Sequence, residues 1–241
     1  MMQASRDRGA SVNARPQCYK RRMHAKFTAL NPELYDYLVA HNPPQDEVQK
    51  ALAAETAALG PISMMQIAVE QGAFLTLLTR LLGVQFAVEI GTFTGYSAIS
   101  IARGLAPGGR LLCCDVSEEW TAIARRYWER AKLTDRIELR IAPAVDTLRA
   151  LPKSPPVDLA FVDADKTSYR AYYEELLPRL SPRGVIVFDN VLWGGSVAEP
   201  SVQDESTQAI RALNDFIATD PRVDAVMLPV ADGITLVRRR K

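Results

Sequence analysis

Cysteine is scarce in this sequence of 241 residues, which contains only Cys18, Cys113 and Cys114. An odd number of cysteines, two of them adjacent in an apparent strand, argues against a framework of disulfide bonds. Adjacent strand residues point to opposite faces of a sheet, so we expect Cys113 and Cys114 to be buried as small apolar groups. This use of cysteine predicts a cytoplasmic protein.

Long apolar runs and a charge of one sign are also missing. No stretch of about 18 consecutive apolar residues is present, so we expect no membrane span. The formal net charge is +1, so no overall field attracts nucleic acid or a membrane surface, and we predict neither as a partner. Hydrophobic residues make up 48% of the chain, which is enough for a sizeable core.

The first 25 residues differ from the rest in charge. Basic residues stand at positions 6, 8, 15, 20, 21 and 22, while Asp7 is the one acidic residue, and apolar periodicity is missing. We interpret residues 1–25 as a basic, disordered tail. A transit peptide is the alternative, because the segment contains arginine and serine and is poor in acid; the apolar core of a signal peptide is missing.

Residues 26–84 have the pattern of a helical domain. Apolar residues recur at helical spacing from Pro32 until Asn42-Pro43-Pro44 breaks the pattern, and two further helices are predicted over about 46–59 and 69–82. Gly83 is placed to end the third helix. We therefore expect three helices ahead of the first strand.

Residues 85–241 alternate between strand and helix patterns. Strands are predicted at 86–90, 110–115, 136–141, 157–163 and 184–189, with helices between them at 96–105, 118–131, 143–150 and 168–179. Such alternation is typical of a parallel, doubly wound α/β sheet. A helix at 204–219 and strands at 223–228 and 233–238 follow, and the short link between these strands predicts an antiparallel hairpin at the sheet edge.

The first predicted strand leads into a turn with two glycines. Residues 86–97 read FAVEIGTFTGYS, in which Glu89 precedes Gly91 and Gly95. Glycine lacks a Cβ, so the backbone N–H groups of such a turn can approach a ligand closely. The spacing matches neither the G-x-G-x-x-G dinucleotide fingerprint nor a phosphate-binding P-loop. Glu89 favours a partly cationic ligand; an ordinary strand-to-helix turn is the alternative.

Carboxylates stand at the ends of four predicted strands. Ligands of open α/β sheets bind beyond the carboxyl ends of the strands, so these side chains would face one crevice. Asp115 lies 24 residues after Gly91, where an acid can accept both hydroxyls of a ribose. A helix cap is the alternative role for Asp115, but Ser117 is available for capping.

Asp163, Asp189 and Asn190 end the fourth and fifth strands and are expected to converge. Two carboxylates and an amide oxygen are hard ligands that suit Mg²⁺, Mn²⁺ or Ca²⁺. Zinc is disfavoured, since no cysteine or histidine joins them. The alternative is a set of loop-capping residues.

Two further side chains are candidates for chemistry and substrate binding. Lys166 follows Asp163 by three residues, and a lysine beside a divalent cation loses its proton more readily and can act as a base. A solvated ion pair with Asp165 is the alternative. Trp193 could form one wall for an aromatic substrate or simply cover a loop. Met64 and Met65 could line a pocket for an adenosyl or thioether group, or fill the core.

Four stretches of the sequence together resemble a known family. They are residues 88–97 (VEIGTFTGYS), 161–166 (FVDADK), 189–197 (DNVLWGGSV) and 228–235 (LPVADGIT). The chain resembles the cation-dependent O-methyltransferases that include caffeoyl-CoA and catechol O-methyltransferases. The resemblance implies the class I methyltransferase sandwich, a Rossmann-like, seven-stranded, mostly parallel sheet with a C-terminal antiparallel hairpin.

The resemblance also implies roles for individual residues. Binding of the methyl donor S-adenosylmethionine is implied for Met65, Glu89, Gly91, Thr92, Gly95, Ser97, Asp115, Ala144 and Asp163. Cation binding, with Mg²⁺ first and Mn²⁺ or Ca²⁺ as alternatives, is implied for Asp163, Asp189 and Asn190. Lys166 matches the proposed base, acting beside Asp163 in the catalytic site, and Trp193 would contact substrate.

The resemblance further implies a homodimer whose N-terminal helices help to form the acceptor pocket. The segment from Val197 to Gln203 is short, whereas plant members carry a longer insertion that contributes to the acyl-CoA pocket. A bacterial-type enzyme that methylates a hydroxyl of a small vicinal diphenol is therefore expected. The alternatives are an NAD-dependent oxidoreductase, which the missing third glycine disfavours, and a non-catalytic methyltransferase-like binding protein.

Overall fold

The computed structural model describes residues 28–152 and 154–240, so the basic tail 1–25 and Cys18 lie outside the described residues. The chain divides into two compact units, one up to Tyr37 and one from Leu38 onward. Helix α1 (Pro32–Ala40) begins where the Asn31 side chain accepts a hydrogen bond from the Leu34 backbone N–H at 2.8 Å. The sheet and all the candidate site residues belong to the second unit.

The three helices predicted ahead of the sheet are present as α1, α2 (Glu47–Ala57) and α3 (Val69–Leu82). A 3₁₀ helix that was not predicted, η2 (Gly60–Met65), lies between α2 and α3. Asp46 caps α2 by accepting hydrogen bonds from the Val48 and Gln49 N–H groups at 3.0 and 2.9 Å. Helix α3 ends at Gly83, whose left-handed conformation (φ 62°) serves as the predicted cap. Both α2 and α3 pack in the same compact unit as the sheet.

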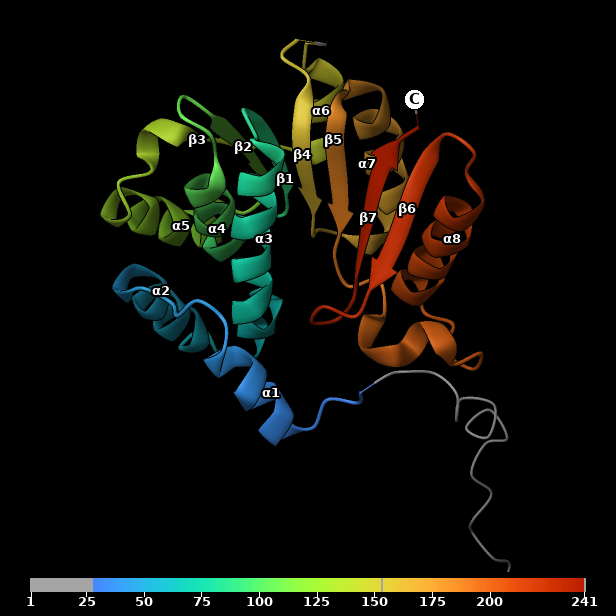
Figure 1. Ribbon diagram of the computed structural model, residues 1–241, viewed down its shortest axis with the longest axis horizontal. Coiled ribbons are helices and arrows are strands. Elements are labelled where there is room, and N and C mark those ends of the chain that lie inside the picture. Colours follow the sequence, from blue (N-terminus) through green and yellow to red (C-terminus); the bar gives the residue numbers. More distant parts are fainter. Residues whose placement is uncertain (1–27, 153, 241) are drawn as a thin grey trace, which may run out of the picture. The chain divides into compact units, whose positions relative to one another are not determined.

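Seven strands form one sheet in the order β3-β2-β1-β4-β5-β7-β6 (Figure 1). The strands are β1 (Phe86–Ile90), β2 (Arg110–Asp115), β3 (Ile137–Ile141), β4 (Val157–Val162), β5 (Leu180–Phe188), β6 (Val223–Leu228) and β7 (Ile234–Arg239). The pairs among β1 to β5 are parallel, whereas β7 pairs antiparallel with both β5 and β6. This confirms the predicted α/β sheet with its C-terminal antiparallel hairpin.

Only β5 begins well away from its predicted position. The sequence Ser181-Pro182-Arg183-Gly184 is typical of a turn, so the strand was expected to start at residue 184. Instead it starts at Leu180, which pairs with Val157 of β4 before the register shifts. The irregularity lets the strand pass through Pro182 and Gly184 without losing its parallel partner.

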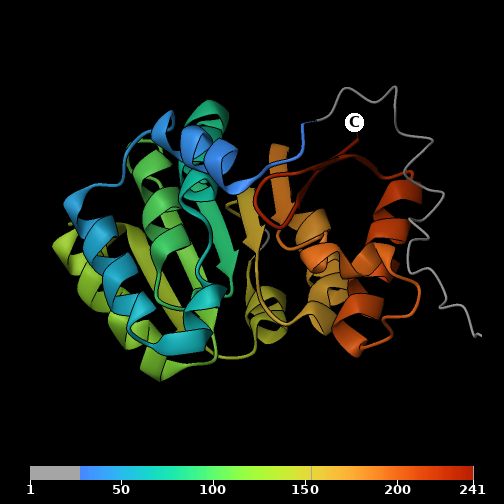
Figure 2. The ribbon, with the colours of Figure 1, turned by 90° about the horizontal axis from the view of Figure 1, so that it is seen from below.

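Helices cover both faces of the sheet, as Figures 1 and 2 show. One apolar core lies between the sheet and α2, α3, α4 (Tyr96–Gly104) and α5 (Glu118–Arg130). The other lies between the sheet and α6 (Ala144–Ala150), α7 (Tyr169–Leu176) and α8 (Glu205–Thr219). Cys113 belongs to the first core and Cys114 to the second, both fully buried, as the alternation of strand residues predicts.

One segment of the described residues, Gly60–Leu82, is long and apolar enough to cross a membrane by length and composition, with a mean hydropathy of 1.2 over a stretch of 18 residues. It consists of two helices, since the backbone is extended at Gln66 and Ala68 between η2 and α3. Helix α3 also packs closely on α4, where Gly72 leaves room for Tyr96. The segment is therefore not one continuous helix, and its second part is a core helix of the α/β unit.

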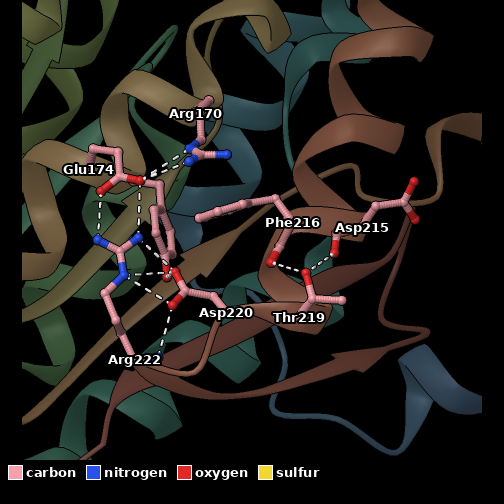
Figure 3. Close-up of polar contacts among 8 residues, drawn as sticks. Arg170, Glu174, Asp215, Phe216, Thr219, Asp220 and Arg222 are labelled. Atoms are coloured by element: carbon pink, nitrogen blue, oxygen red, sulfur yellow. Dashed lines mark hydrogen bonds and ion pairs between the residues drawn. The ribbon is translucent and has the colours of Figure 1, made fainter.

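A polar cluster joins α7 to the turn between α8 and β6 (Figure 3). Arg222 donates to both carboxylate oxygens of Asp220, at 3.0, 3.0 and 2.7 Å, and to both oxygens of Glu174, at 2.9 and 3.0 Å. The Tyr173 hydroxyl donates to Asp220 at 2.7 Å. Arg222 lowers the pKa of the Asp220 carboxyl well below its ordinary range. The cluster fixes the beginning of the C-terminal hairpin.

Candidate active site

A cavity of about 1120 Å³ opens at the carboxyl ends of β1, β2, β4 and β5. This is the edge of an open α/β sheet at which ligands bind. The start of α3 and the β6–β7 turn complete its walls. Its volume exceeds the roughly 300–1,000 Å³ of a typical small-molecule site, which leaves space for two ligands side by side.

The glycine turn after β1 forms one wall of the cavity. Gly91 has φ 85°, and a Cβ at this position would collide with the backbone carbonyl of Asp163. The Gly91 N–H donates to the Cys114 carbonyl at 2.9 Å. Only glycine therefore lets the ends of β1 and β4 meet, and this brings the turn against Asp163.

Asp115, at the end of β2, holds the same turn by its side chain. One carboxylate oxygen accepts hydrogen bonds from the Thr92 and Phe93 N–H groups, both at 2.9 Å. The other accepts from the Ser117 N–H at 2.8 Å. Ser117 itself caps α5 by accepting from the Trp120 N–H at 3.2 Å, so Asp115 is not the side chain that caps this helix. Asp115 remains at the cavity wall, where the sequence predicts a ribose.

Glu89 lies beneath the turn and is fully buried. One of its carboxylate oxygens accepts a hydrogen bond from the Cys113 thiol at 3.3 Å, and the other has no partner among the described residues. Burial raises the pKa of Glu89 to about 8. Glu89 supports the turn from below and does not line the cavity, which is lined instead by its neighbours Ile90 and Gly91.

The other residues predicted to bind the donor are mostly brought together. Met65, Gly91, Thr92, Ser97, Asp115, Ala144 and Asp163 line the cavity. Gly95 is the exception, because its Cα faces α5, where a Cβ would meet Ala124 and Trp128. Its role is close helix packing. The alternative that Met64 and Met65 fill the core is wrong, because their side chains lie at the cavity with 86% and 43% exposure.

Asp163, Asn190 and Lys166 meet at the rim between β4 and β5. Lys166 Nζ, which is nearly buried, donates to Asp163 Oδ1 at 3.0 Å and to Asn190 Oδ1 at 2.7 Å. The alternative pairing of Lys166 with Asp165 is wrong, since Asp165 accepts from the Tyr172 hydroxyl at 2.6 Å instead. The lysine therefore faces the cavity with the candidate cation ligands.

Asp189 completes this group and is only 2% exposed. Burial and the adjacent Asp163 carboxylate raise its pKa, while the side chain of Gln71 and the Asn190 N–H, which donates at 2.7 Å, lower it. Gln71 is buried at the start of α3, and its side chain faces Asp189. Helix α3 thus brings an amide to the Asp189 side of the cavity.

The donor set fits a hard divalent cation. Among the described residues no three His, Cys, Asp or Glu side chains are grouped, so the site offers two carboxylates and one amide oxygen. Oxygen ligands of this kind suit Mg²⁺, Mn²⁺ or Ca²⁺ and not a structural zinc. The ammonium group of Lys166 already lies between the Asp163 and Asn190 oxygens, which marks the place where positive charge is favourable.

Tyr169 and Asp232 contribute to the site without having been singled out from the sequence. The Lys166 ammonium donates to the Tyr169 hydroxyl oxygen at 2.6 Å, and this hydroxyl lies 3.2 Å from the carbonyls of Val162 and Asp189. The sequence signal that could have identified Tyr169 was its spacing of three residues from Lys166 across η4 (Lys166–Ser168), which brings two side chains of a helix together. Asp232 lies in the stretch LPVADGIT, whose matching sequence carried no assigned role.

The loop after β5 is short and held by one arginine. Trp193 lines the cavity, with Lys166 Nζ 5.5 Å from its ring centroid, and it begins η6 (Trp193–Ala198). Arg211 of α8 donates to the carbonyls of Ser196, Val197 and Val202 at 2.7, 3.0 and 2.8 Å, and also to that of Glu199. A single guanidinium group thus satisfies four backbone carbonyls of the loop.

Comparison with known proteins identifies the class of this site. Residues 40–240 match the model of a family described as O-methyltransferase. The chain is 39% identical over 213 residues to "Probable caffeoyl-CoA O-methyltransferase 1" of Dictyostelium discoideum, covering 87% of this chain and 93% of that protein. It is 34% identical over 246 residues to caffeoyl-CoA O-methyltransferase 2 of Eucalyptus globulus, covering 95% and 99%.

The same class appears among solved structures. The O-methyltransferase from Bacillus cereus in complex with SAH matches with a TM-score of 0.79 and 36% identity, covering 86% of this chain and 97% of that one. The sheet order and the cavity above the glycine turn are thus those of a class I methyltransferase that uses S-adenosylmethionine. The chain belongs to the O-methyltransferase family of caffeoyl-CoA O-methyltransferase type. The predicted family, fold and methyl donor are confirmed, and the nicotinamide-dependent alternative has no support.

Proposed function

We propose that this methyltransferase requires a divalent cation and transfers the methyl group to one hydroxyl of a small vicinal diphenol. The observation that carries the proposal is the meeting of Asp163, Asp189 and Asn190 with Lys166 at one rim of the donor cavity. Asp163, Asp189 and Asn190 would hold the cation. When bound, a divalent cation acts as a Lewis acid that lowers the pKa of a phenol and favours two adjacent oxygens.

The donor would occupy the part of the cavity beside the glycine turn. Asp115 fixes the Thr92 and Phe93 N–H groups and has a carboxylate edge at the cavity for the ribose hydroxyls. Ser97, Ala144 and Met65 would contact the remainder of the donor. These residues bind and orient the donor, and correct orientation supplies a large part of the acceleration in a two-substrate reaction.

Lys166 would take the proton from the reacting hydroxyl. Its Nζ is held by Asp163, Asn190 and Tyr169, so it has one fixed position at the rim. A base must lie within hydrogen-bond reach of the proton that it removes, and Lys166 lies beside the candidate cation ligands. Trp193 would place the aromatic ring of the acceptor, since its indole lines the cavity next to Lys166.

We also propose a cytoplasmic homodimer with no nucleic-acid or membrane partner. The near-zero net charge supports the absence of a nucleic-acid or membrane partner, and the free, buried thiols of Cys113 and Cys114 support a reducing compartment. Exposed apolar side chains on the edge strand β6, Val226 and Met227, support an interface between copies. Sedimentation should then give the mass of two chains; a monomer at micromolar concentration would contradict the dimer.

The proposal is tested with labelled S-adenosylmethionine, a panel of phenols and Mg²⁺ or a chelator. We expect transfer to catechols, no transfer in chelator, and poor transfer to matched monophenols, because only a vicinal pair offers two adjacent oxygens. Asp163→Ala and Asp189→Ala should abolish transfer while circular dichroism shows that the fold remains intact. Wild-type turnover in chelator would refute the cation requirement. Monophenols that react as well as catechols would refute the vicinal diphenol.

A further inference from the structure

We infer that Asp232 is a positioning residue that sets the orientation of the Asn190 amide and thereby the affinity of the cation site. The inference rests on the proposed cation requirement. Asp232 lies in the turn between β6 and β7, far from Asn190 in sequence, and lines the same cavity.

The loop that carries Asn190 is strained and is tied to this turn. Asn190, Trp193 and Gly194 have positive φ values of 55°, 49° and 59°. Non-glycine residues rarely adopt such values unless the surrounding structure enforces them. The β6–β7 turn contacts residues 191–194 directly, and Asn214 Nδ2 of α8 donates to the Val191 carbonyl at 2.9 Å, so the geometry of the loop depends in part on residues that follow it by about 40 positions.

Two backbone–backbone hydrogen bonds, one hydrogen bond from the backbone to a side chain, and one close contact make this connection. The Val191 N–H donates to the Gly233 carbonyl at 3.1 Å, and the Leu192 N–H donates to the Asp232 carbonyl at 3.0 Å. The Gly194 N–H donates to Asp232 Oδ1 at 2.7 Å. At Gly233 (φ 83°) a Cβ would collide with the Leu192 side chain, so the two segments meet without space between them.

The second oxygen of Asp232 acts on the amide itself. Asn190 Nδ2 faces Asp232 Oδ2 at 3.4 Å, while Asn190 Oδ1 accepts from Lys166 Nζ at 2.7 Å. A carboxylate can only accept and an ammonium can only donate, so one orientation of the amide satisfies both neighbours. The reverse orientation would set the amide NH₂ against the ammonium and its oxygen against the carboxylate. Asp232 therefore keeps the Asn190 oxygen toward the cation site.

Two substitutions separate the two functions of this carboxylate. In Asp232→Asn, an amide oxygen can still accept from the Gly194 N–H, but the introduced NH₂ faces Asn190 Nδ2 and favours the reversed amide. In Asp232→Ala both contacts are lost. Asp224→Asn is the matched control, because Asp224 is an exposed residue of β6 that pairs with Arg240 at 2.7 Å, away from the cavity.

The measurement is Mn²⁺ binding to the full chain by calorimetry, without donor or acceptor, together with hydrogen exchange of residues 190–195. Loss of a residue that orients a metal ligand typically weakens metal binding about 10- to 100-fold. We expect this loss in Asp232→Asn with unchanged loop exchange, the same loss with faster exchange in Asp232→Ala, and wild-type affinity in Asp224→Asn.

Three different results would overturn the inference, and each can be told from the others. If the wild type binds Mn²⁺ and Asp232→Asn binds it equally well, Asp232 has no positioning role while the cation site stands. If the wild type itself binds no Mn²⁺, Mg²⁺ or Ca²⁺, the cation requirement fails and the role of Asp232 fails with it. Equal weakening by Asp224→Asn would show a general charge effect and also refute the inference.

Discussion

Replacing Glu89 by glutamine should stabilise the ligand-free protein, and the gain should grow with pH. Glu89 is fully buried; one carboxylate oxygen accepts a hydrogen bond from the Cys113 thiol, and the other has no partner within residues 28–152 and 154–240. Burial raises its pKa from 4.5 to about 8. Between these values the native carboxyl keeps its proton while the unfolded chain has lost it, so native stability falls as the pH rises.

The size of this effect follows from the shift of the pKa. One pKa unit corresponds to about 1.4 kcal/mol, so the loss of stability is roughly 2 kcal/mol at pH 6 and approaches about 5 kcal/mol above pH 8. Glutamine has nearly the same shape and does not titrate. The advantage of Glu89→Gln over the wild type should therefore increase by about 2–3 kcal/mol between pH 6 and pH 8.5.

Urea unfolding of both proteins at pH 6, 7.2 and 8.5 measures this difference. Glu119→Gln is the matched control, since Glu119 is exposed in the first turn of α5 and its substitution should have an effect independent of pH over this range. If the difference between Glu89→Gln and the wild type is the same at all three pH values, the carboxyl titrates normally and the reasoning from burial is wrong.

Three other substitutions test the donor turn, the base and the hairpin anchor. Asp115→Ala should raise the KM for S-adenosylmethionine more than it lowers kcat, because the turn that binds the donor loses its brace; an equal loss in kcat with unchanged KM would contradict this. Lys166→Met should abolish the rising, acidic limb of the pH–rate profile, because a base acts only after it has lost its proton, and an unchanged profile would exclude Lys166 as the base. Arg222→Met should lower the free energy of unfolding, measured in urea at pH 7, by about 1–2 kcal/mol. We reduce this figure for solvent screening, because Arg222 is half exposed although Asp220 is buried. Because the pKa of Asp220 is lowered, this cost should begin to decline as the pH falls below about 4 and should vanish only at still lower pH, where the native carboxyl itself takes up a proton; a cost that does not decline in acid would contradict the assignment.

The order of elements could be predicted because each local signal agreed with the global fold. Strands β1 and β2 lie at the predicted residues, since apolar runs of this length flanked by glycine and charged residues are distinctive. The predicted start of β5 at residue 184 was wrong. The sequence Ser181-Pro182-Arg183-Gly184 is typical of a turn, and only the pairing of Leu180 with Val157 shows that the strand begins at Leu180. Pairing between distant strands is not visible in a local pattern.

The site was predictable as a set of residue types, but its internal contacts were not. Asp163 and Asn190 were expected to converge because parallel strands end at one edge. Lys166 pairs with Asp163 and not with Asp165, although Asp165 is its neighbour in the sequence. This pairing depends on the 3₁₀ helix η4 that follows β4. Asp115 was expected to bind a ribose, with a helix cap as the alternative. In the structure it also accepts hydrogen bonds from the Thr92 and Phe93 N–H groups. These bonds depend on the position of the turn, which is set by the close approach of Gly91 to the Asp163 carbonyl and is not visible in the sequence.

The hydrogen bonds from Arg211 to the carbonyls of residues 196–202 limit how this segment can be redesigned. A longer graft inserted after Trp193 would carry more carbonyls than one guanidinium group can reach, so it would need hydrogen-bond donors of its own. Conversely, grafts of unchanged length that retain Arg211 could vary the side chains of residues 196–202, because Arg211 bonds only to their backbone. The segment is therefore open to engineering by sequence at fixed length before it is open to engineering by length.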